Sequence, residues 1–306
     1  MIGVLAFTFL VIVVIAAARK ATERQPIALP TRTSETAAAE PSAAERPTSK
    51  PTSRPTREDD ASEKPAPRLN RTLKNNTVYQ AGSLARPKCP AGNASIYDHA
   101  RFKALILKTG RCMGQAWAPA LRRVGIEWSP PGYVIARSRG RGACGDYPMP
   151  GSNVPYYCPS NSTIYASTSA MAKEYGPLGA WNGIIVSMMG HEYGHHIQHI
   201  TGISDSWWAR YQESSSRSAQ LALTRRHELQ ATCFGAMFMR SVERSYPITP
   251  ARRNTLLWAY GYIGDQPGGP RDHGSTRNNA VWFRQGYTRP KVHQCNTWVM
   301  GSSYVS

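Results

Sequence analysis

Two histidines and a glutamate lie within one short stretch of the sequence, in the order His191-Glu192-x-x-His195. Residues four apart lie one turn apart on the same face of a helix, so the two imidazoles can converge on one ion at Zn–N distances of about 2.0–2.1 Å. Glu192 lies about 100° round the helix from His191, where a carboxylate can reach a metal-bound water. The spacing therefore predicts a zinc (Zn²⁺) site in which Glu192 is the general base.

The residues that precede this motif favour a buried helix. Positions 184–186 and 188–189 are all apolar, so the polar side chains of the motif enter an apolar environment. Burying such groups is costly unless they are hydrogen-bonded or bound to metal. Histidines that are simply hydrogen-bonded in the core are the alternative, and the apolar context favours the metal site over them.

A catalytic zinc site needs three protein ligands and one open position. A continuation of the metzincin type would need Gly at position 198 and His at position 201, but the sequence has Gln198 and Thr201. Histidines at 191, 195 and 199 would spread over about 12 Å of helix and cannot all converge. We therefore expect His199 to be structural or to support a ligand from outside the metal shell.

Glu228 is the expected third ligand. It lies in a later apolar segment, where a carboxylate is costly unless it is paired or bound to metal. The adjacent His227 would point off a different face of that helix, and we expect it to be a surface or packing residue. Two histidines and one glutamate form the ligand set of thermolysin-type sites.

Such a site predicts peptide-bond hydrolysis. Zinc lowers the pKa of a bound water toward about 7, and Glu192 would take the proton and return it to the leaving amine. Besides zinc, a nearby hydrogen-bond donor would stabilise the developing oxyanion. His273 is the candidate for this catalytic role, with Tyr193 and Tyr287 as lesser ones; the alternative for His273, favoured by spacing alone, is a loop histidine in a turn.

Hydrophobic periodicity predicts an α+β, mainly helical domain with a small β-sheet. The His-Glu-x-x-His motif makes this expected domain zincin-like. We expect helices at 98–108, at 115–124 with an interruption near Pro119, at 179–200 and at 225–241, and short strands at 133–136 and 163–166. Residues 203–226 are rich in Ser and Arg and are expected to form a connection. A strand edge beside the zinc helix could hold an extended peptide substrate by β-augmentation.

The N-terminal quarter differs in composition from the rest. Residues 2–18 are apolar and uncharged, at the short limit for a membrane span, so we expect a transmembrane anchor or a secretory signal over 1–18. A disordered Pro/Ala/Ser/Thr-rich linker is expected over 19–77 and the metallopeptidase domain over 78–306. The protein would then be membrane-anchored or secreted with its catalytic domain on the extracytoplasmic side, although Arg19-Lys20 argues the other way under the positive-inside rule.

All six cysteines fall after residue 78, and an exported domain would pair them in disulfides. Six cysteines allow fifteen pairings. Cys144 with Cys158, which flank a short loop, is the first expected pair. Cys233 with Cys295 is the second, which leaves Cys89 with Cys112; a cysteine zinc site is disfavoured because no Cys-x-x-Cys spacing is present.

The chain carries a formal net charge of +18. A nucleic-acid partner is not expected, because Arg and Lys are scattered among turns without a binding motif. Attraction to an anionic cell-envelope polymer or lipid surface suits an exported domain better. A basic surface that serves only solubility is the equal alternative.

Several stretches together resemble the bacterial neutral zinc metallopeptidase family. They cover roughly residues 85–300 in the family's order, and they are 142–145, 155–165, 191–198, 228–235, 273–277, 282–287 and Cys295. The resemblance implies a single peptidase domain behind an N-terminal membrane segment. It also implies His191, His195 and Glu228 as zinc ligands and Glu192 as a catalytic residue, and it supports His273 as a site residue.

One position departs from that family pattern. Thr232 stands where the family usually has Asp, one turn after the glutamate ligand. In thermolysin-like enzymes such an Asp orients a zinc-bound histidine, and losing a supporting group of this kind typically costs 10–100-fold in metal affinity or activity. We therefore expect weakened activity and, from the sequence alone, a gain in zinc affinity when Asp is restored at 232. A catalytically weak envelope-binding protein that keeps the fold is the alternative function.

Overall fold

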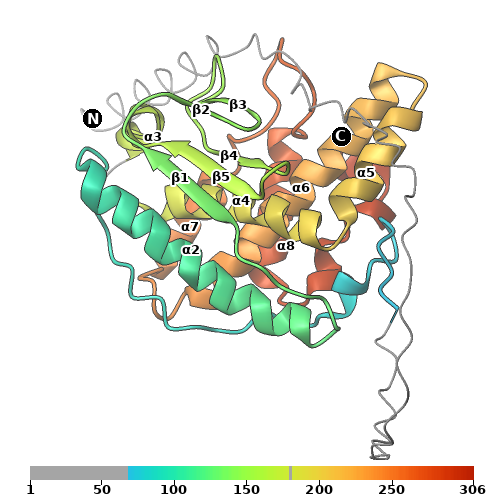
Figure 1. Ribbon diagram of the computed structural model, residues 1–306, viewed down its shortest axis with the longest axis horizontal. Coiled ribbons are helices and arrows are strands. Elements are labelled where there is room, and N and C mark those ends of the chain that lie inside the picture. Colours follow the sequence, from blue (N-terminus) through green and yellow to red (C-terminus); the bar gives the residue numbers. More distant parts are fainter. Residues whose placement is uncertain (1–67, 179–180) are drawn as a thin grey trace, which may run out of the picture.

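The computed structural model describes residues 68–178 and 181–306 (Figure 1). The expected membrane segment at 1–18 and most of the expected linker at 19–77 lie outside these residues. Within the described ranges, no helix combines the length and apolar character needed to cross a membrane.

Helices make up most of this part of the chain. They are α2 (His99–Arg122), α3 (Thr168–Tyr175), α4 (Gly183–Ile200), α5 (Ile203–Glu213), α6 (Arg217–Val242), α7 (Pro250–Ala259) and α8 (Thr276–Thr288). Short 3-10 turns are η1 (Thr77–Gln80), η2 (Gly176–Leu178), η3 (Val292–Cys295), η4 (Thr297–Val299) and η5 (Ser302–Tyr304). α6 packs against α4 on one side and α8 on the other, at the centre of the fold (Figure 1).

A small sheet lies beside the helices, as the α+β expectation requires. Its strands are β1 (Gly132–Ala136), β5 (Thr163–Ser167) and β4 (Tyr156–Cys158), in that spatial order. β1 and β5 run parallel, whereas β4 pairs antiparallel to β5 and forms an edge of the sheet next to α4. A separate hairpin consists of β2 (Gly140–Gly142) and β3 (Gly145–Tyr147). The strands expected at 133–136 and 163–166 are confirmed.

The backbones of α4 and α6 approach each other closely through glycines. A Cβ placed on Gly235 of α6 would lie 2.8 Å from the backbone nitrogen of His191, and one on Gly194 of α4 would lie 2.8 Å from the carbonyl oxygen of Ala231. One turn further along α4, Gln198 Nε2 donates to the carbonyl oxygen of His227. Successive contacts involve later residues of α4 and earlier residues of α6, so the two helices pack antiparallel.

The helix expected at 115–124 is not separate. α2 runs unbroken from His99 to Arg122 with Pro119 inside it. Pro119 lies in the last turn, where it removes the hydrogen bond to one carbonyl group but leaves only a few residues of helix beyond it. The expected interruption was therefore wrong: the loss of one hydrogen bond in the last turn does not break this helix, which continues to Arg122.

The connection expected at 203–226 was also wrong. Those residues form α5 and the first turns of α6, which begins at Arg217. Ser216 caps α6 by accepting from the backbone N–H of Ala219, and the aromatic rings of Trp207 and Tyr211 contact each other along α5, at a centroid distance of 5.7 Å. Their spacing of four residues is helical, and the Ser and Arg content obscured it.

Residues 68–77, expected to belong to the linker, pack on the domain. Leu69 and Leu73 contact the hydrophobic core, and the side-chain amide of buried Asn76 donates to the carbonyl oxygen of Thr201 at the end of α4. The folded unit therefore begins before residue 78.

All three expected disulfides are present. Cys144–Cys158 ties the β2–β3 hairpin to β4, Cys89–Cys112 ties the segment before α2 to that helix, and Cys233–Cys295 ties α6 to η3. No cysteine in the described residues is free. The last of these bonds joins residues 62 positions apart and holds the C-terminal segment against the central helix.

The close contact between α4 and α6 leads to a first prediction. Gly235→Ala should lower stability by about 1–3 kcal/mol, because the new methyl group meets the backbone of His191 rather than a side chain that can move. Zinc affinity should fall as well, because α4 must shift relative to α6. Urea unfolding and a zinc-binding titration measure the two effects. Gly301→Ala, at a site with open space around the added atom, is the control and should change neither.

Candidate metal centre

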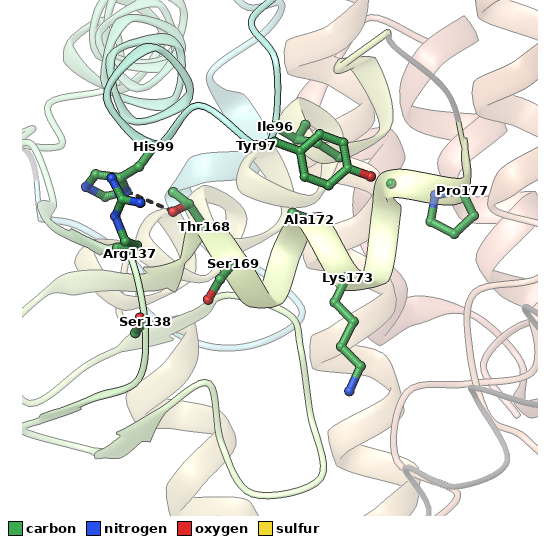
Figure 2. Close-up of a pocket in the computed structure, with 11 residues that line it drawn as sticks. Ile96, Tyr97, His99, Arg137, Ser138, Thr168, Ser169, Ala172, Lys173 and Pro177 are labelled. Carbon is green, nitrogen blue, oxygen red and sulfur yellow. Dashed lines mark hydrogen bonds between the residues drawn. The ribbon is translucent and has the colours of Figure 1, made fainter.

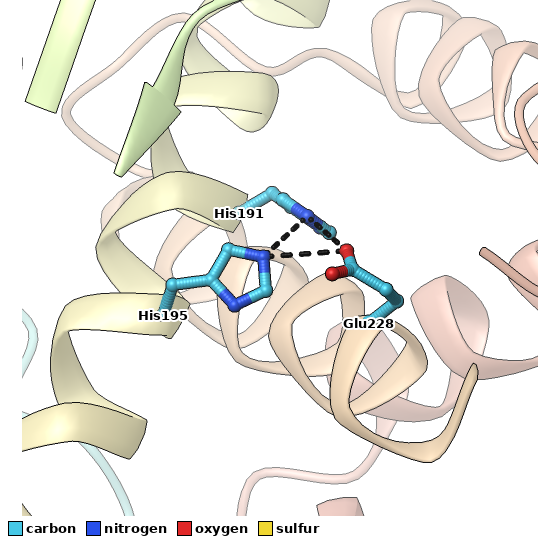
Figure 3. Close-up of side chains that lie close together, drawn as sticks. All are labelled: His191, His195 and Glu228. Atoms are coloured by element: carbon cyan, nitrogen blue, oxygen red, sulfur yellow. Dashed lines mark hydrogen bonds and ion pairs between the residues drawn. The ribbon is translucent and has the colours of Figure 1, made fainter. Parts of the chain in front are cut away.

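Three side chains from α4 and α6 converge on one point (Figure 3). His191 Nε2 lies 3.1 Å from His195 Nε2, and these two nitrogens lie 3.2 and 3.3 Å from Glu228 Oε2. The three residues form a group whose ligand atoms all lie within 4.8 Å of one another. The structure thus brings together the three residues expected to be ligands.

The dimensions of this group match a tetrahedral zinc ion. Ligand atoms bound at 2.0–2.1 Å in tetrahedral geometry are separated by about 3.3–3.4 Å. The three observed separations, from 3.1 to 3.3 Å, are close to that value. Two imidazoles and a carboxylate also form a donor set that suits zinc, so the residues present fit the ion.

The outer nitrogen of His195 is fixed by an amide. His195 Nδ1 lies 2.9 Å from Gln198 Oε1, and Gln198 Nε2 donates to the carbonyl oxygen of His227 at 2.8 Å and to Gln230 Oε1 at 3.1 Å. Because the amide nitrogen faces two acceptors, its oxygen must face the imidazole. His195 Nδ1 therefore carries a proton, so Nε2 is the nitrogen that can present a lone pair to a metal ion.

The outer nitrogen of His191 contacts the residue that departs from the family pattern. His191 Nδ1 lies 3.2 Å from the hydroxyl oxygen of Thr232, which is buried. Thr232 therefore occupies the face from which an Asp would orient this histidine. Its contribution is a neutral hydrogen bond instead of a charged one.

The charged side chains of the cluster shift one another's pKa values. Burial by itself would raise the pKa of Glu228, but His195 and His273 nearby and hydrogen bonding with the two ligand histidines lower it well below its usual range. Burial alone would lower the pKa of His195, yet the carboxylates of Glu228 and Glu192 raise it to about 9. In the metal-free protein this cluster therefore holds a proton, which a bound cation would displace.

Glu192, the expected base, lies beside the ligand group but does not belong to it. Its Oε2 accepts the backbone N–H of Tyr157 in β4 at 2.8 Å. Burial raises the pKa of Glu192 above its ordinary value, partly opposed by His191 and His195. A raised pKa is what a general base working near neutral pH requires.

Tyr157 is a site residue that sequence reasoning missed. Its hydroxyl lies 2.6 Å from His199 Nδ1 and 3.2 Å from His196 Nδ1, so two imidazoles of α4 hold the strand that supplies the N–H to Glu192. His199 is structural, in agreement with the expectation. The only signal in the sequence was a pair of tyrosines in a short stretch before Cys158, which does not distinguish a core side chain from a support of the base.

Of the three candidates for the oxyanion donor, only His273 lies near the metal cluster. His273 Nε2 lies 3.8 Å from Glu228 Oε2, while its Nδ1 lies 2.5 Å from Asp272 Oδ1. Its side chain is 43% exposed, so it lies at the open rim of the metal cluster. Tyr193 accepts a hydrogen bond from Trp128 on another side of α4, and Tyr287 donates to the partly buried Glu243 at the end of α6. Neither tyrosine faces the cluster, so both lesser candidates were wrong.

His227 is a packing residue and is not at the surface. Its ring stacks between His195, at a centroid distance of 5.0 Å, and Trp207, at 4.6 Å. Its Nε2 lies 3.1 Å from the hydroxyl of Ser204. α5, which was not expected, therefore braces the back of a metal-ligand ring.

Comparison with known proteins agrees with this site. The family model described as "putative neutral zinc metallopeptidase" matches residues 75–298. The chain belongs to this family. It is 27% identical over 214 residues to the uncharacterized protein YpfJ of Escherichia coli K12, a match that covers 66% of this chain and 72% of that one. It is 26% identical over 227 residues to the uncharacterized proteins Mb2605 of Mycobacterium bovis and Rv2575 of Mycobacterium tuberculosis H37Rv, with the same coverage of 66% and 72%. No solved structure matches the chain significantly.

A separate hollow of about 700 Å³ lies away from the metal cluster and shares no residue with it. Figure 2 shows His99, Arg137 and Thr168 together at one end and Tyr97 and Pro177 at the other. His99 Nδ1 lies 2.8 Å from the Thr168 hydroxyl. None of the residues lining this hollow is acidic, so it is a basic surface feature distinct from the metal site.

The buried ring of His227 leads to a second prediction. Burial, helped by His195, lowers its pKa from 6.5 to about 3, so the unfolded chain takes up a proton first as the pH falls. The contribution of neutral His227 to the free energy of unfolding is complete above about pH 6.5 and is lost as the pH falls toward 3. About 2 kcal/mol of it is lost between pH 7 and pH 5. His227→Phe keeps the aromatic stack and should reduce the pH dependence of the unfolding free energy by that amount.

Urea unfolding at pH 7 and pH 5, with chelator present throughout, measures the difference. His293→Gln, at an exposed histidine, is the control and should behave as the wild type. Equal pH dependence in His227→Phe and the wild type would contradict the burial argument.

Proposed function

We propose that the protein is a zinc-dependent peptidase that hydrolyses peptide bonds with Glu192 as general base. The observation that carries this proposal is the convergence of His191, His195 and Glu228 at tetrahedral ligand spacing, with the buried carboxylate of Glu192 beside them. Membership of the family supports the same conclusion.

Each side chain has a separate task in this reaction. When bound, zinc would supply Lewis acidity, lowering the pKa of a water and polarising the scissile carbonyl. One oxygen of Glu192 is held by the Tyr157 N–H, so the other oxygen can take the water's proton and later pass it to the leaving amine. His273, at the rim, would donate to the oxyanion, and its contact with Asp272 through Nδ1 supports this role.

The substrate would lie along the edge of the sheet. β4 pairs with β5 on one side only, and its residue Tyr157 contacts the base. An extended peptide added to β4 would have its backbone held by strand hydrogen bonds next to Glu192. Short extended segments of polypeptide are therefore the proposed substrate class.

Location and partners are further proposals that rest on composition. The apolar run at 2–18 supports anchoring in a membrane or export, with the catalytic domain on the extracytoplasmic side. The three disulfides suit an oxidising compartment. The net charge of +18 and the basic hollow at Arg137 support attraction to an anionic envelope polymer.

Glu192→Gln provides the test of the reaction. We expect peptide cleavage to fall by at least 10²-fold, because the amide cannot accept the proton, while each chain still binds one zinc. Cleavage of a peptide library and metal content, each measured with and without chelator, give the two readouts. Glu174→Gln, at a partly buried glutamate that bonds Asn153, is the matched control and should keep wild-type activity.

The outcomes separate the proposed reaction from a binding function. Wild-type protein that binds zinc but cleaves no peptide would favour the catalytically weak envelope-binding alternative, for which Thr232 in place of a charged residue is the supporting observation. Unchanged cleavage in Glu192→Gln would contradict the assigned base.

A further inference from the structure

The side chain of Asn279, in α8, joins the metal site to the loop that carries His273. It is only 3% exposed. Its Nδ2 lies 2.9, 3.1 and 3.3 Å from the carbonyl oxygens of His273, Gly274 and Ser275, and its Oδ1 lies 3.2 Å from the hydroxyl oxygen of Thr232. Every polar atom of this buried amide is therefore engaged.

The orientation of the Asn279 amide follows from its partners. Carbonyl oxygens can only accept hydrogen bonds, so the group that faces the three of them must be the NH₂. The reversed amide would place Oδ1 against three carbonyl oxygens inside the protein, where unpaired acceptors are costly. Oδ1 must therefore point at Thr232.

That orientation fixes the proton of the Thr232 hydroxyl. Oδ1 of Asn279 can only accept, so Thr232 donates its single proton to it. The hydroxyl oxygen can then only accept from His191 Nδ1, 3.2 Å away on the other side. His191 is thereby held with its proton on Nδ1, and the lone pair of Nε2 faces Glu228 and His195.

We infer that Asn279 is a positioning residue for the metal site, acting through Thr232 to set the tautomer in which His191 meets a metal ion. The inference rests on the zinc site of the proposed function but not on peptide cleavage. A chain of neutral groups, ending on three backbone carbonyls, here replaces the carboxylate that orients such a histidine in thermolysin-like sites. Because the same amide holds the backbone of residues 273–275, it also fixes His273 relative to the ligand group.

This series of hydrogen bonds reverses the expectation that Asp at position 232 would raise zinc affinity. A carboxylate at position 232, which is 2% exposed, would face Asn279 Oδ1 with no proton between them. Turning the amide to donate to the carboxylate would break its bonds to residues 273–275. Thr232→Asp alone is therefore expected to bind zinc no more tightly than the wild type.

The first experiment compares Thr232→Val with Thr232→Ser in the purified full chain. Val matches Thr in shape but removes the hydroxyl, so zinc affinity, measured by competition with a chromophoric chelator, should fall about 10–100-fold. Ser keeps the hydroxyl and should remain within a few-fold of the wild type. In metal-free protein, ¹⁵N chemical shifts of the His191 ring should show a proton on Nδ1 in the wild type and the Ser variant, and a mixture of tautomers in Val.

Asn279→Leu tests the amide that directs these hydrogen bonds. Leu has a similar shape but offers no acceptor for the Thr232 proton, so the hydroxyl can turn toward His191 and zinc affinity should fall by the same order as in Thr232→Val. The double variant should lose little more than either single one, because both substitutions break the same series of hydrogen bonds. Asn278→Leu is the matched control. Asn278 is 4% exposed and its Nδ2 donates to the carbonyl oxygens of Ser303 and Ser306, away from the metal site, so zinc affinity should not change.

The results that would overturn the inference are specific. They are wild-type zinc affinity and an unchanged His191 tautomer in Thr232→Val, additive losses in the double variant, or tenfold tighter zinc binding in Thr232→Asp. The isosteric Thr232 variants keep the test decisive if Asn279→Leu does not fold. Because these readouts need no substrate, the expected affinity pattern in a protein without peptidase activity would defeat the proposed function and leave this inference standing.

Discussion

The close antiparallel contact between α4 and α6 is the constraint on which the rest of the structure depends. Gly194 and Gly235 let the two backbones meet where any side chain would separate them. Only at this separation do His191 and His195, one turn apart on α4, bring their inner nitrogens within about 3.3 Å of Glu228 on α6. The three candidate ligands therefore converge only when α4 and α6 pack closely. The Cys233–Cys295 bond and α8 hold α6 from its other side.

A second requirement concerns protons. Two lone pairs and a carboxylate that point at one another repel unless a cation or a proton lies between them. The protein favours the cation by placing protons on the outer nitrogens: Gln198 does so for His195, and Thr232 with Asn279 does so for His191. In both chains the last group is an amide whose direction is set by acceptors that cannot donate. Neutral groups therefore give the ligands the orientation that a charged partner gives in related sites.

The sheet contacts the site through strand β4. β4 supplies the N–H that holds Glu192, and the Tyr157 hydroxyl is held in turn by His196 and His199 of the metal helix. Since Cys158 of the same strand is bonded to Cys144, the β2–β3 hairpin is fixed to the strand that contacts Glu192. Glu192, the candidate ligands and the proposed substrate edge are consequently joined by direct contacts, which limits how far any of them can move independently.

The sequence by itself determined whatever depends on local spacing. The separation of His191 from His195 by one helical turn, the exclusion of a ligand at 201 and the apolar surroundings of Glu228 predicted the ligand set, and the short loop between Cys144 and Cys158 predicted a disulfide. The N–H of Tyr157, the amide of Gln198 and the side chain of Asn279 left no such signal. The stretch 203–226 was misjudged because its Ser and Arg content concealed helical aromatic spacing. Only the tertiary structure decided these roles, because hydrogen-bond direction depends on partners that are distant in the chain, and no periodicity along the sequence encodes them.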